Sequence, residues 1–252
     1  METFNNELES NKILIIGHRG IPSLAFENTL ESFQKLIDFN IEGTELDVLL
    51  TKDKIPVVYH DFSLKRFTGK DIKIKDIYFE ELKKIELVDF SLKKLKVPTL
   101  FEVLDVIKDL KLINIEIKEN KKDNEDTENK VIEVIRKYKI EDIVVISSFN
   151  PFVISRLKKK APDIKRGLLV SKIGTPFYIK KMYFYNLASP DFIHFDIRMI
   201  HDKEVQKFYK VNPNLVFWCV DNINELILSL KYKPIFIISN IPHQIKNYLK
   251  KN

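Results

Sequence analysis

Residues 43–49 read Gly-Thr-Glu-Leu-Asp-Val-Leu, a short and mostly apolar run that carries two carboxylates, Glu45 and Asp47. Such a run is typical of a parallel strand that is covered on both faces. Similar runs recur along the chain and alternate with stretches of helical periodicity. The eight predicted strands cover residues 13–17, 43–49, 112–117, 143–147, 165–170, 192–195, 215–220 and 235–238.

A helix is predicted after each strand. Asn28-Thr29 and Asn222 stand where helix N-caps belong, and Pro151, Pro176 and Pro242 stand in first turns. Eight such pairs, without a Gly-rich nucleotide-binding loop, favour an α/β protein built as a closed (β/α)8 TIM barrel over an open doubly wound sheet. The predicted helices cover residues 27–39, 100–110, 124–138, 151–160, 176–185, 203–209, 223–230 and 242–249.

The segment 52–98 departs from this alternation. It contains an extra short strand over 56–59 and then a charged stretch, so we interpret it as an insertion on the loop face of one barrel domain spanning 1–252. A hydrophobic fraction of 44% and a charged fraction of 31% indicate a globular protein and exclude disorder as the main state. The single cysteine, Cys219, excludes an internal disulfide and a thiolate zinc site, which favours a reducing compartment.

The formal charge of +6 suits nucleic acid, an anionic membrane or a phosphate-bearing small molecule. The basic runs 158–160 and 180–181 alternate with apolar residues, so we interpret them as solvated helix faces and expect no nucleic-acid partner. No apolar run is long enough to span a membrane, and the polar residues 1–12 lack a signal-peptide pattern. We therefore expect a cytoplasmic protein; the sequence leaves its oligomeric state open.

Polar residues gather where predicted strands end, which is where a barrel carries its chemistry. Glu45 and Asp47 are two positions apart and therefore share one face of their strand. If that face is interior, a metal ion most simply relieves their repulsion. His18, Arg19, His60, Glu116 and Lys118 lie at neighbouring strand ends. Carboxylates bind a hard cation and Arg and Lys bind an anion, so this pattern predicts a cation site beside a phosphate site.

Several short motifs follow one another along the chain. They are Gly17-His18-Arg19-Gly20, Glu27-Asn28-Thr29, Glu45-Leu46-Asp47-Val48, His60-Asp61, Val97-Pro98-Thr99-Leu100, Asn114-Ile115-Glu116-Ile117-Lys118, Ser148-Phe149 and Trp218. Together, in this order and spacing, they resemble the glycerophosphodiester phosphodiesterase family. The resemblance implies a TIM barrel with a small insertion after the second strand. It also implies metal-dependent hydrolysis of a small-molecule glycerophosphodiester to an alcohol and sn-glycerol 3-phosphate.

The resemblance also assigns roles to residues. His18 and His60 correspond to the two catalytic histidines, and Glu45, Asp47 and Glu116 correspond to the ligands of one divalent cation. Oxygen ligands suit Mg²⁺ or Ca²⁺ better than zinc. Arg19 and Lys118 correspond to the phosphate-binding groups, and Trp218 to an aromatic residue at the mouth. Which histidine is the acid, and whether water or a glycerol hydroxyl attacks, stay open. His194, His201 and His243 are expected to be structural.

The sequence departs from the family pattern in several places. Phe26 stands where the family usually has Pro. Cys219-Val220-Asp221 replaces Thr-Val-Asn, and the last strand, preceded by Lys233-Pro234, ends in Ser239-Asn240 where the family has Thr-Asp. The proposed catalytic set is intact, but the head group on the alcohol side cannot be carried over.

Four alternatives remain. Phospholipase D-like toxins share the paired histidines, but they are secreted and disulfide-bonded, unlike a chain with one cysteine. Cleavage of lysophospholipids uses the same diester chemistry. The aromatics of 177–178 and 183–185 would then form a lip for peripheral membrane contact, although simple packing of a helix on the barrel is favoured. A non-enzymatic phosphate binder would have lost a catalytic residue, and none is missing. A nucleic-acid binder is the least favoured.

Overall fold

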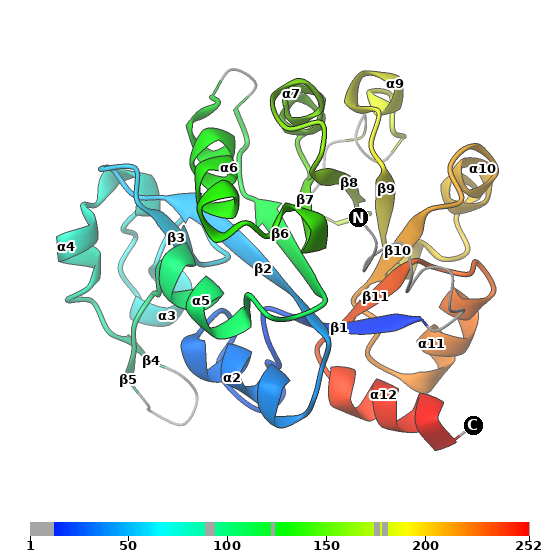
Figure 1. Ribbon diagram of the computed structural model, residues 1–252, viewed down its shortest axis with the longest axis horizontal. Helices are drawn as coiled ribbons and strands as arrows, with labels where there is room; N and C mark the ends of the chain where they lie inside the picture. Colours follow the sequence, from blue (N-terminus) through cyan, green and yellow to red (C-terminus); the bar gives the residue numbers. More distant parts are fainter. Residues whose placement is uncertain (1–12, 89–93, 122–123, 174–176, 178–180, 252) are drawn as a thin grey trace.

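The computed structural model describes residues 13–88, 94–121, 124–173, 177 and 181–251 (Figure 1). Eight parallel strands form a closed ring in the spatial order β1, β11, β10, β9, β8, β7, β6, β2, and β1 pairs with β2 to close it. The predicted TIM barrel is therefore confirmed. The strands are β1 (Leu14–His18), β2 (Gly43–Leu50), β6 (Leu112–Ile117), β7 (Val144–Ser148), β8 (Lys165–Val170), β9 (Phe192–Asp196), β10 (Leu215–Trp218) and β11 (Phe236–Ser239).

Helices surround the ring (Figure 1). Thr29 caps the first of them by accepting a hydrogen bond from Ser32 N, and Asn28 before it has a positive φ of 57°, so this helix begins later than predicted. Asn222 and Pro151 take their predicted places at an N-cap and a first helical position. The helices are α2 (Leu30–Asp38), α5 (Leu100–Ile107), α6 (Asp126–Tyr138), α7 (Pro151–Lys160), α9 (Tyr185–Ala188), α10 (Lys203–Val211), α11 (Ile223–Leu230) and α12 (Pro242–Lys251), with the 3-10 turns η2 (Glu141–Ile143) and η3 (Ile197–Met199).

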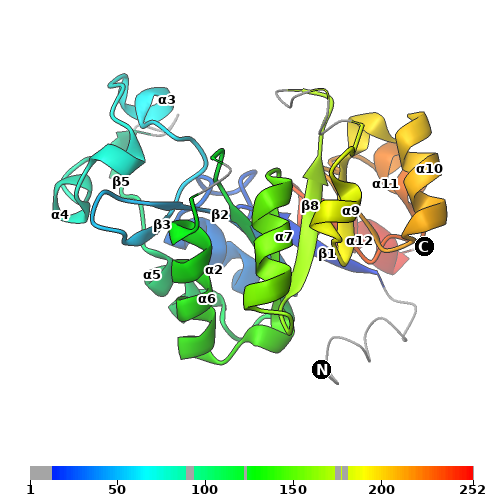
Figure 2. The same ribbon diagram turned by 90° about the horizontal axis from the view of Figure 1, so that it is seen from above.

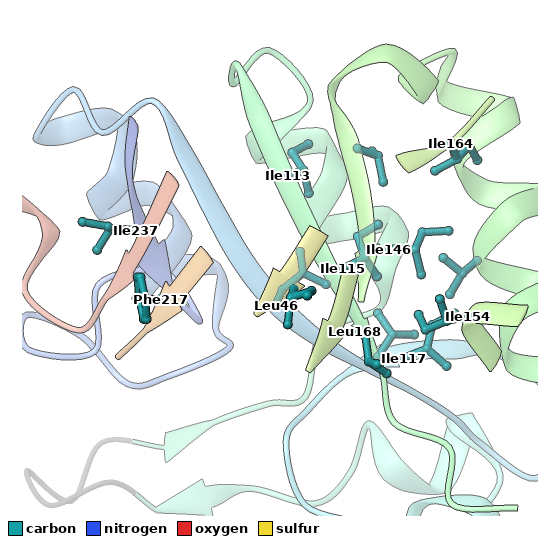
Figure 3. Close-up of a cluster of buried hydrophobic side chains, with 14 of the residues drawn as sticks. Leu46, Ile113, Ile115, Ile117, Ile146, Ile154, Ile164, Leu168, Phe217 and Ile237 are labelled. Atoms are coloured by element: carbon teal, nitrogen blue, oxygen red, sulfur yellow. The ribbon is translucent and has the colours of Figure 1, made fainter. Parts of the chain in front are cut away.

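The side chains of each strand alternate between two cores. One cluster fills the barrel interior and consists of strand residues, among them Leu14, Ile16, Val216 and Phe236. The other lies between the strands and the helices, and Figure 3 shows part of it around β6 and β7. The inward direction of the even-numbered residues on β1 carries His18 to the interior at the carboxyl end of the strand.

The insertion lies to one side of the barrel in both views (Figures 1 and 2). It pairs with the barrel through β3 (Pro56–Val58), which runs antiparallel to β2, and it buries its own apolar cluster, including Leu64, Ile74 and Leu82. Phe26, one of the departures from the family pattern, packs edge-on against Phe67 of the insertion, with 4.5 Å between the ring centroids. The other elements of the insertion are α3 (Lys65–Thr68), η1 (Ile74–Asp76), α4 (Phe79–Leu82), β4 (Leu87–Val88) and β5 (Lys94–Leu95).

Apart from shifts of a few residues at the ends of other elements, two predicted elements differ more clearly from the structure. The strand predicted over 215–220 ends at Trp218. The helix predicted over 176–185 falls partly on residues outside the described ranges, including Pro176, and the described residues 181–184 form turns before α9 begins at Tyr185. Among the described residues, no helix is long and apolar enough to cross a lipid bilayer.

Replacing Gly17 by alanine is expected to destabilise the barrel where it carries His18. A Cβ at this position would lie 2.1 Å from Gly20 O and 2.7 Å from Leu36 Cδ2, closer than real atoms approach. Relieving such an overlap typically costs about 1–3 kcal/mol. Urea unfolding should show a lower midpoint for Gly17→Ala, and an unchanged midpoint would contradict this account of the turn.

Candidate active site

The carboxyl ends of the strands surround a cavity of about 610 Å³. All of the predicted site residues line it except Asp47, which lies fully buried. One side of the cavity is charged and polar, with residues from β1, β2, β6 and the loop after β3. The other side is largely apolar and comes from the β7, β8 and β10 region: Phe149, Phe152, Leu169, Ile173 and Trp218.

Glu45, Asp47 and Glu116 point into the barrel from the adjacent strands β2 and β6. One carboxylate oxygen from each lies within 4.8 Å of the others. Neither Glu45 Oε1 nor Asp47 Oδ1, both buried, accepts a hydrogen bond from any residue that the structure describes. Burial and the neighbouring Asp47 carboxylate raise the pKa of Glu45, and burial also raises that of Glu116. Three neighbouring carboxylates, two of which keep a buried oxygen that accepts no hydrogen bond, fit a hard divalent cation.

Two cations flank this cluster. Arg19 Nε lies 3.0 Å from Asp47 Oδ2, while Lys118 Nζ lies 3.0 Å from Glu116 Oε1 and 3.5 Å from Asp47 Oδ1. Burial alone would raise the pKa of Asp47, but Arg19 and Lys118 outweigh it and hold the pKa well below its usual range. Both cations face the cavity, which therefore presents positive groups next to the carboxylates.

The turn after β1 sets the direction of Arg19. The φ of Arg19 is +58°, in the left-handed region. Its side chain is held by a hydrogen bond that Nη1 donates to Glu27 Oε1 at 2.9 Å. Asn28, which the sequence suggested only as a cap residue, donates from Nδ2 to Asp47 Oδ2 at 2.9 Å. The motif Glu27-Asn28-Thr29 therefore positions Arg19, orients Asp47 and starts α2.

His18 lies partly buried between the carboxylates and the end of β11. Its Nδ1 lies 2.8 Å from Asn240 Oδ1, and its Nε2 lies 3.8 Å from Glu45 Oε2. Burial and the nearby Arg19 charge lower its pKa to about 3, which favours the neutral ring.

His60 faces the same cavity from the loop after β3. Its Nδ1 lies 2.5 Å from Asp61 Oδ1, so the adjacent carboxylate orients the ring. Asp61 in turn accepts from Arg66 Nε at 2.6 Å, and Arg66 Nη2 donates to Glu27 Oε1 at 2.5 Å. One guanidinium of the insertion thus connects the partner of His60 to the residue that holds Arg19.

The apolar side is centred on Trp218. Its Nε1 donates to His194 O at 3.1 Å, and its ring packs edge-on against Phe149 at 5.7 Å. His194 is fully buried in the barrel below, and burial lowers its pKa to about 3. His194, His201 and His243 do not line the cavity.

Of the aromatic residues at 177–185, Phe177 and Tyr183 are exposed, whereas Tyr185 packs on Phe208 at 5.1 Å. Tyr178 lies outside the described residues. The described aromatics are therefore divided between solvent and core.

Sequence reasoning missed two polar residues that contact the site, Asp221 and Asn240. Asp221 Oδ2 accepts from Asn240 Nδ2 at 2.6 Å, and the same amide reaches His18 through its oxygen. A signal was present, because both are positions at which the sequence departs from the family pattern.

Comparison with known proteins shows the family to which this chain belongs. Residues 18–243 match the model of the Glycerophosphoryl diester phosphodiesterase family. A glycerophosphodiester phosphodiesterase of Caldanaerobacter subterraneus subsp. tengcongensis is 34% identical over 246 residues, which cover 95% of this chain and 99% of the relative.

Two solved structures are similar in both sequence and fold. A phosphodiesterase of Oleispira antarctica, in complex with the product sn-glycerol-3-phosphate, has a TM-score of 0.80 at 25% identity and covers 96% of this chain and 99% of its own. A glycerophosphodiester phosphodiesterase of Thermotoga maritima has a TM-score of 0.72 at 29% identity, with 94% and 98% covered.

Proposed function

Since this chain belongs to the glycerophosphoryl diester phosphodiesterase family and is a phosphodiesterase that hydrolyses glycerophosphodiesters, we propose that its products are an alcohol and sn-glycerol 3-phosphate. In this proposal, His18 and His60 act as the general acid and the general base. The observation that carries this proposal is the convergence around one cavity of two histidines, two cations and the carboxylate cluster Glu45, Asp47 and Glu116, of which Asp47 lies buried behind the cavity wall. General acid–base catalysis and charge stabilisation are the two contributions that such a set can supply.

The carboxylates Glu45, Asp47 and Glu116 would hold one divalent cation, Mg²⁺ or Ca²⁺. Two buried oxygens, Glu45 Oε1 and Asp47 Oδ1, accept no hydrogen bond from the described residues, and a metal ion would satisfy them. It would also offset the repulsion among the three carboxylates that remains beside Arg19 and Lys118. When bound, the cation supplies Lewis-acid polarisation of the phosphodiester oxygens and orients the substrate.

The other residues act on charge and protons. Arg19 and Lys118 offset the negative charge that builds on the phosphoryl oxygens as the diester is cleaved. His18 and His60 face the cavity, and each has a hydrogen-bond partner on Nδ1, so Nε2 is the atom available to exchange a proton. Trp218 and Phe149 form an apolar wall against the carbon atoms of the substrate.

Release of sn-glycerol 3-phosphate from a panel of glycerophosphodiesters, with Mg²⁺, with Ca²⁺ and with EDTA, tests the proposal. We expect cation-dependent release that EDTA abolishes and the matching cation restores. Release that is undiminished in stringently metal-free buffer would contradict the cation site. No release from folded protein under any condition would contradict the proposed reaction.

A further inference from the structure

The hydrogen bonds around Asp221 and Asn240 form a chain in which each donor and acceptor is determined. Asp221 is held by two donors of residue 240: the backbone N–H donates to Oδ1 at 2.7 Å, and the side-chain Nδ2 donates to Oδ2 at 2.6 Å. Ser239 Oγ also donates to Oδ1, at 3.2 Å. A carboxylate only accepts, so the amide of Asn240 must present its NH₂ to Asp221.

That orientation determines the proton on His18. With its NH₂ directed to Asp221, Asn240 presents Oδ1 to His18 Nδ1 at 2.8 Å, and an amide oxygen only accepts. His18 must therefore carry its proton on Nδ1. Cys219 Sγ, 3.3 Å from the same atom, is both a weak donor and a weak acceptor, so it is compatible with this arrangement without determining it. A neutral imidazole with a proton on Nδ1 has its lone pair on Nε2, the atom on the side of Glu45.

We propose that Asp221 and Asn240 are a positioning pair that fixes His18 in the tautomer with a free lone pair on Nε2, so that His18 enters the reaction as a proton acceptor. The acceptor role rests on the function proposed above, whereas the tautomer rests on the hydrogen bonds alone. Neither residue lines the cavity, so the pair acts only through the imidazole.

The pair contributes one carboxylate, Asp221, and one amide, Asn240. In this chain the group that touches His18 is neutral, and the charge lies one residue farther away.

A single substitution should reverse the tautomer. In Asp221→Asn, the backbone N–H of residue 240 still requires an oxygen, so the new amide directs its NH₂ toward the side chain of Asn240. Asn240 must then turn its oxygen to residue 221 and its NH₂ to His18, which moves the imidazole proton to Nε2. The double variant Asp221→Asn/Asn240→Asp restores the original order of donors and acceptors at His18.

The decisive measurement is the tautomer of His18, from long-range ¹H–¹⁵N spectra of metal-free protein labelled on histidine, with His18 assigned by its loss in His18→Asn. We expect protonated Nδ1 in the wild type, protonated Nε2 in Asp221→Asn and protonated Nδ1 again in the double variant. Protonated Nε2 in the wild type would overturn the proposal, and this arm stands even if Asp221→Asn fails to fold.

Steady-state kinetics provide the second arm. For Asp221→Asn we expect a loss in kcat of at least about 10-fold, as for an outer-shell partner, and up to about 10⁴-fold, as for a catalytic histidine in the wrong tautomer. KM should change little, and the double variant should recover most of kcat. Asp163→Asn, the same change at a remote carboxylate paired with Arg136, is the control and should match the wild type.

The outcomes separate the two proposals. A double variant no more active than Asp221→Asn would overturn the positioning pair, as would an unchanged kcat in Asp221→Asn. Wild-type protein that shows the expected tautomer but cleaves no diester would instead overturn the proposed function and the acceptor role, and leave the tautomer assignment intact.

Discussion

His18→Ala is expected to lower kcat by about 10²- to 10⁴-fold, the usual contribution of a general acid or base. The variant removes the imidazole that lies between Glu45 and Asn240, and with it the group proposed to exchange the proton at that side of the cavity. Loss of the hydrogen bond to Asn240 should lower the free energy of unfolding by only about 1–3 kcal/mol. Single-turnover release of sn-glycerol 3-phosphate measures the chemical step directly.

His60→Ala provides the companion variant, and we expect a loss of the same order because His60 faces the same cavity from the insertion. Circular dichroism and thermal unfolding should show folded protein in both cases. His201→Ala is the matched control, since its imidazole is exposed and lies outside the cavity, and it should keep full activity. Full activity in both His18→Ala and His60→Ala would end the acid–base assignment.

Glu45→Gln is expected to have two opposite effects, on cation binding and on the metal-free protein. Removing a ligand should weaken cation affinity by more than the roughly 10- to 100-fold that loss of an outer-shell partner costs. Removing one of three mutually repelling carboxylates should stabilise the metal-free fold. Thermal melts in EDTA, Mg²⁺ and Ca²⁺ measure both: the cation should raise the Tm of the wild type by mass action, but not that of the variant.

The pH dependence of those melts gives an independent check. Because burial raises the pKa of Glu45 and Glu116, the folded metal-free protein holds these protons more tightly than the unfolded chain does. Its stability should therefore fall as pH rises from the ordinary glutamate pKa through the raised values. The stability advantage of Glu45→Gln in EDTA should grow over the same window. Glu80→Gln, an exposed change on α4, should show neither effect, and a cation-dependent Tm rise retained in Glu45→Gln would exclude this ligand.

The sequence predicts the barrel well because its strands are covered on both faces. The predicted strands 112–117 and 165–170 agree with β6 and β8 to the residue. The site residues could be predicted as a group, since parallel strands bring their carboxyl ends to one face of the barrel. Side chains two positions apart on a strand share a face, so the sequence predicts that Glu45 and Asp47 lie on the same face of β2. It does not predict whether that face points into the barrel.

What the sequence could not predict depends on contacts between distant segments. Asn28 was interpreted only as a cap residue, because nothing local indicates that its amide reaches Asp47 on the next strand. Arg66 gave no signal within a charged segment, yet it joins Asp61 to Glu27. The helix predicted over 176–185 failed in its described part because aromatic residues such as Tyr183 face solvent there instead of packing in one helical stripe.

The bond between His18 and Asn240 spans 222 positions, from the first strand of the ring to the turn that follows the last. This bond requires the pairing of β1 with β11. That pairing is among the most sequence-distant contacts in the fold, so the loss of chain entropy when it forms is among the largest. Glu45, Asp47 and Glu116 lie instead on the directly paired strands β2 and β6. The cation ligands therefore need only two neighbouring strands, whereas the contact between His18 and Asn240 needs the closed ring. Under the proposed function, the site at His18 is complete only once the first and last strands have paired.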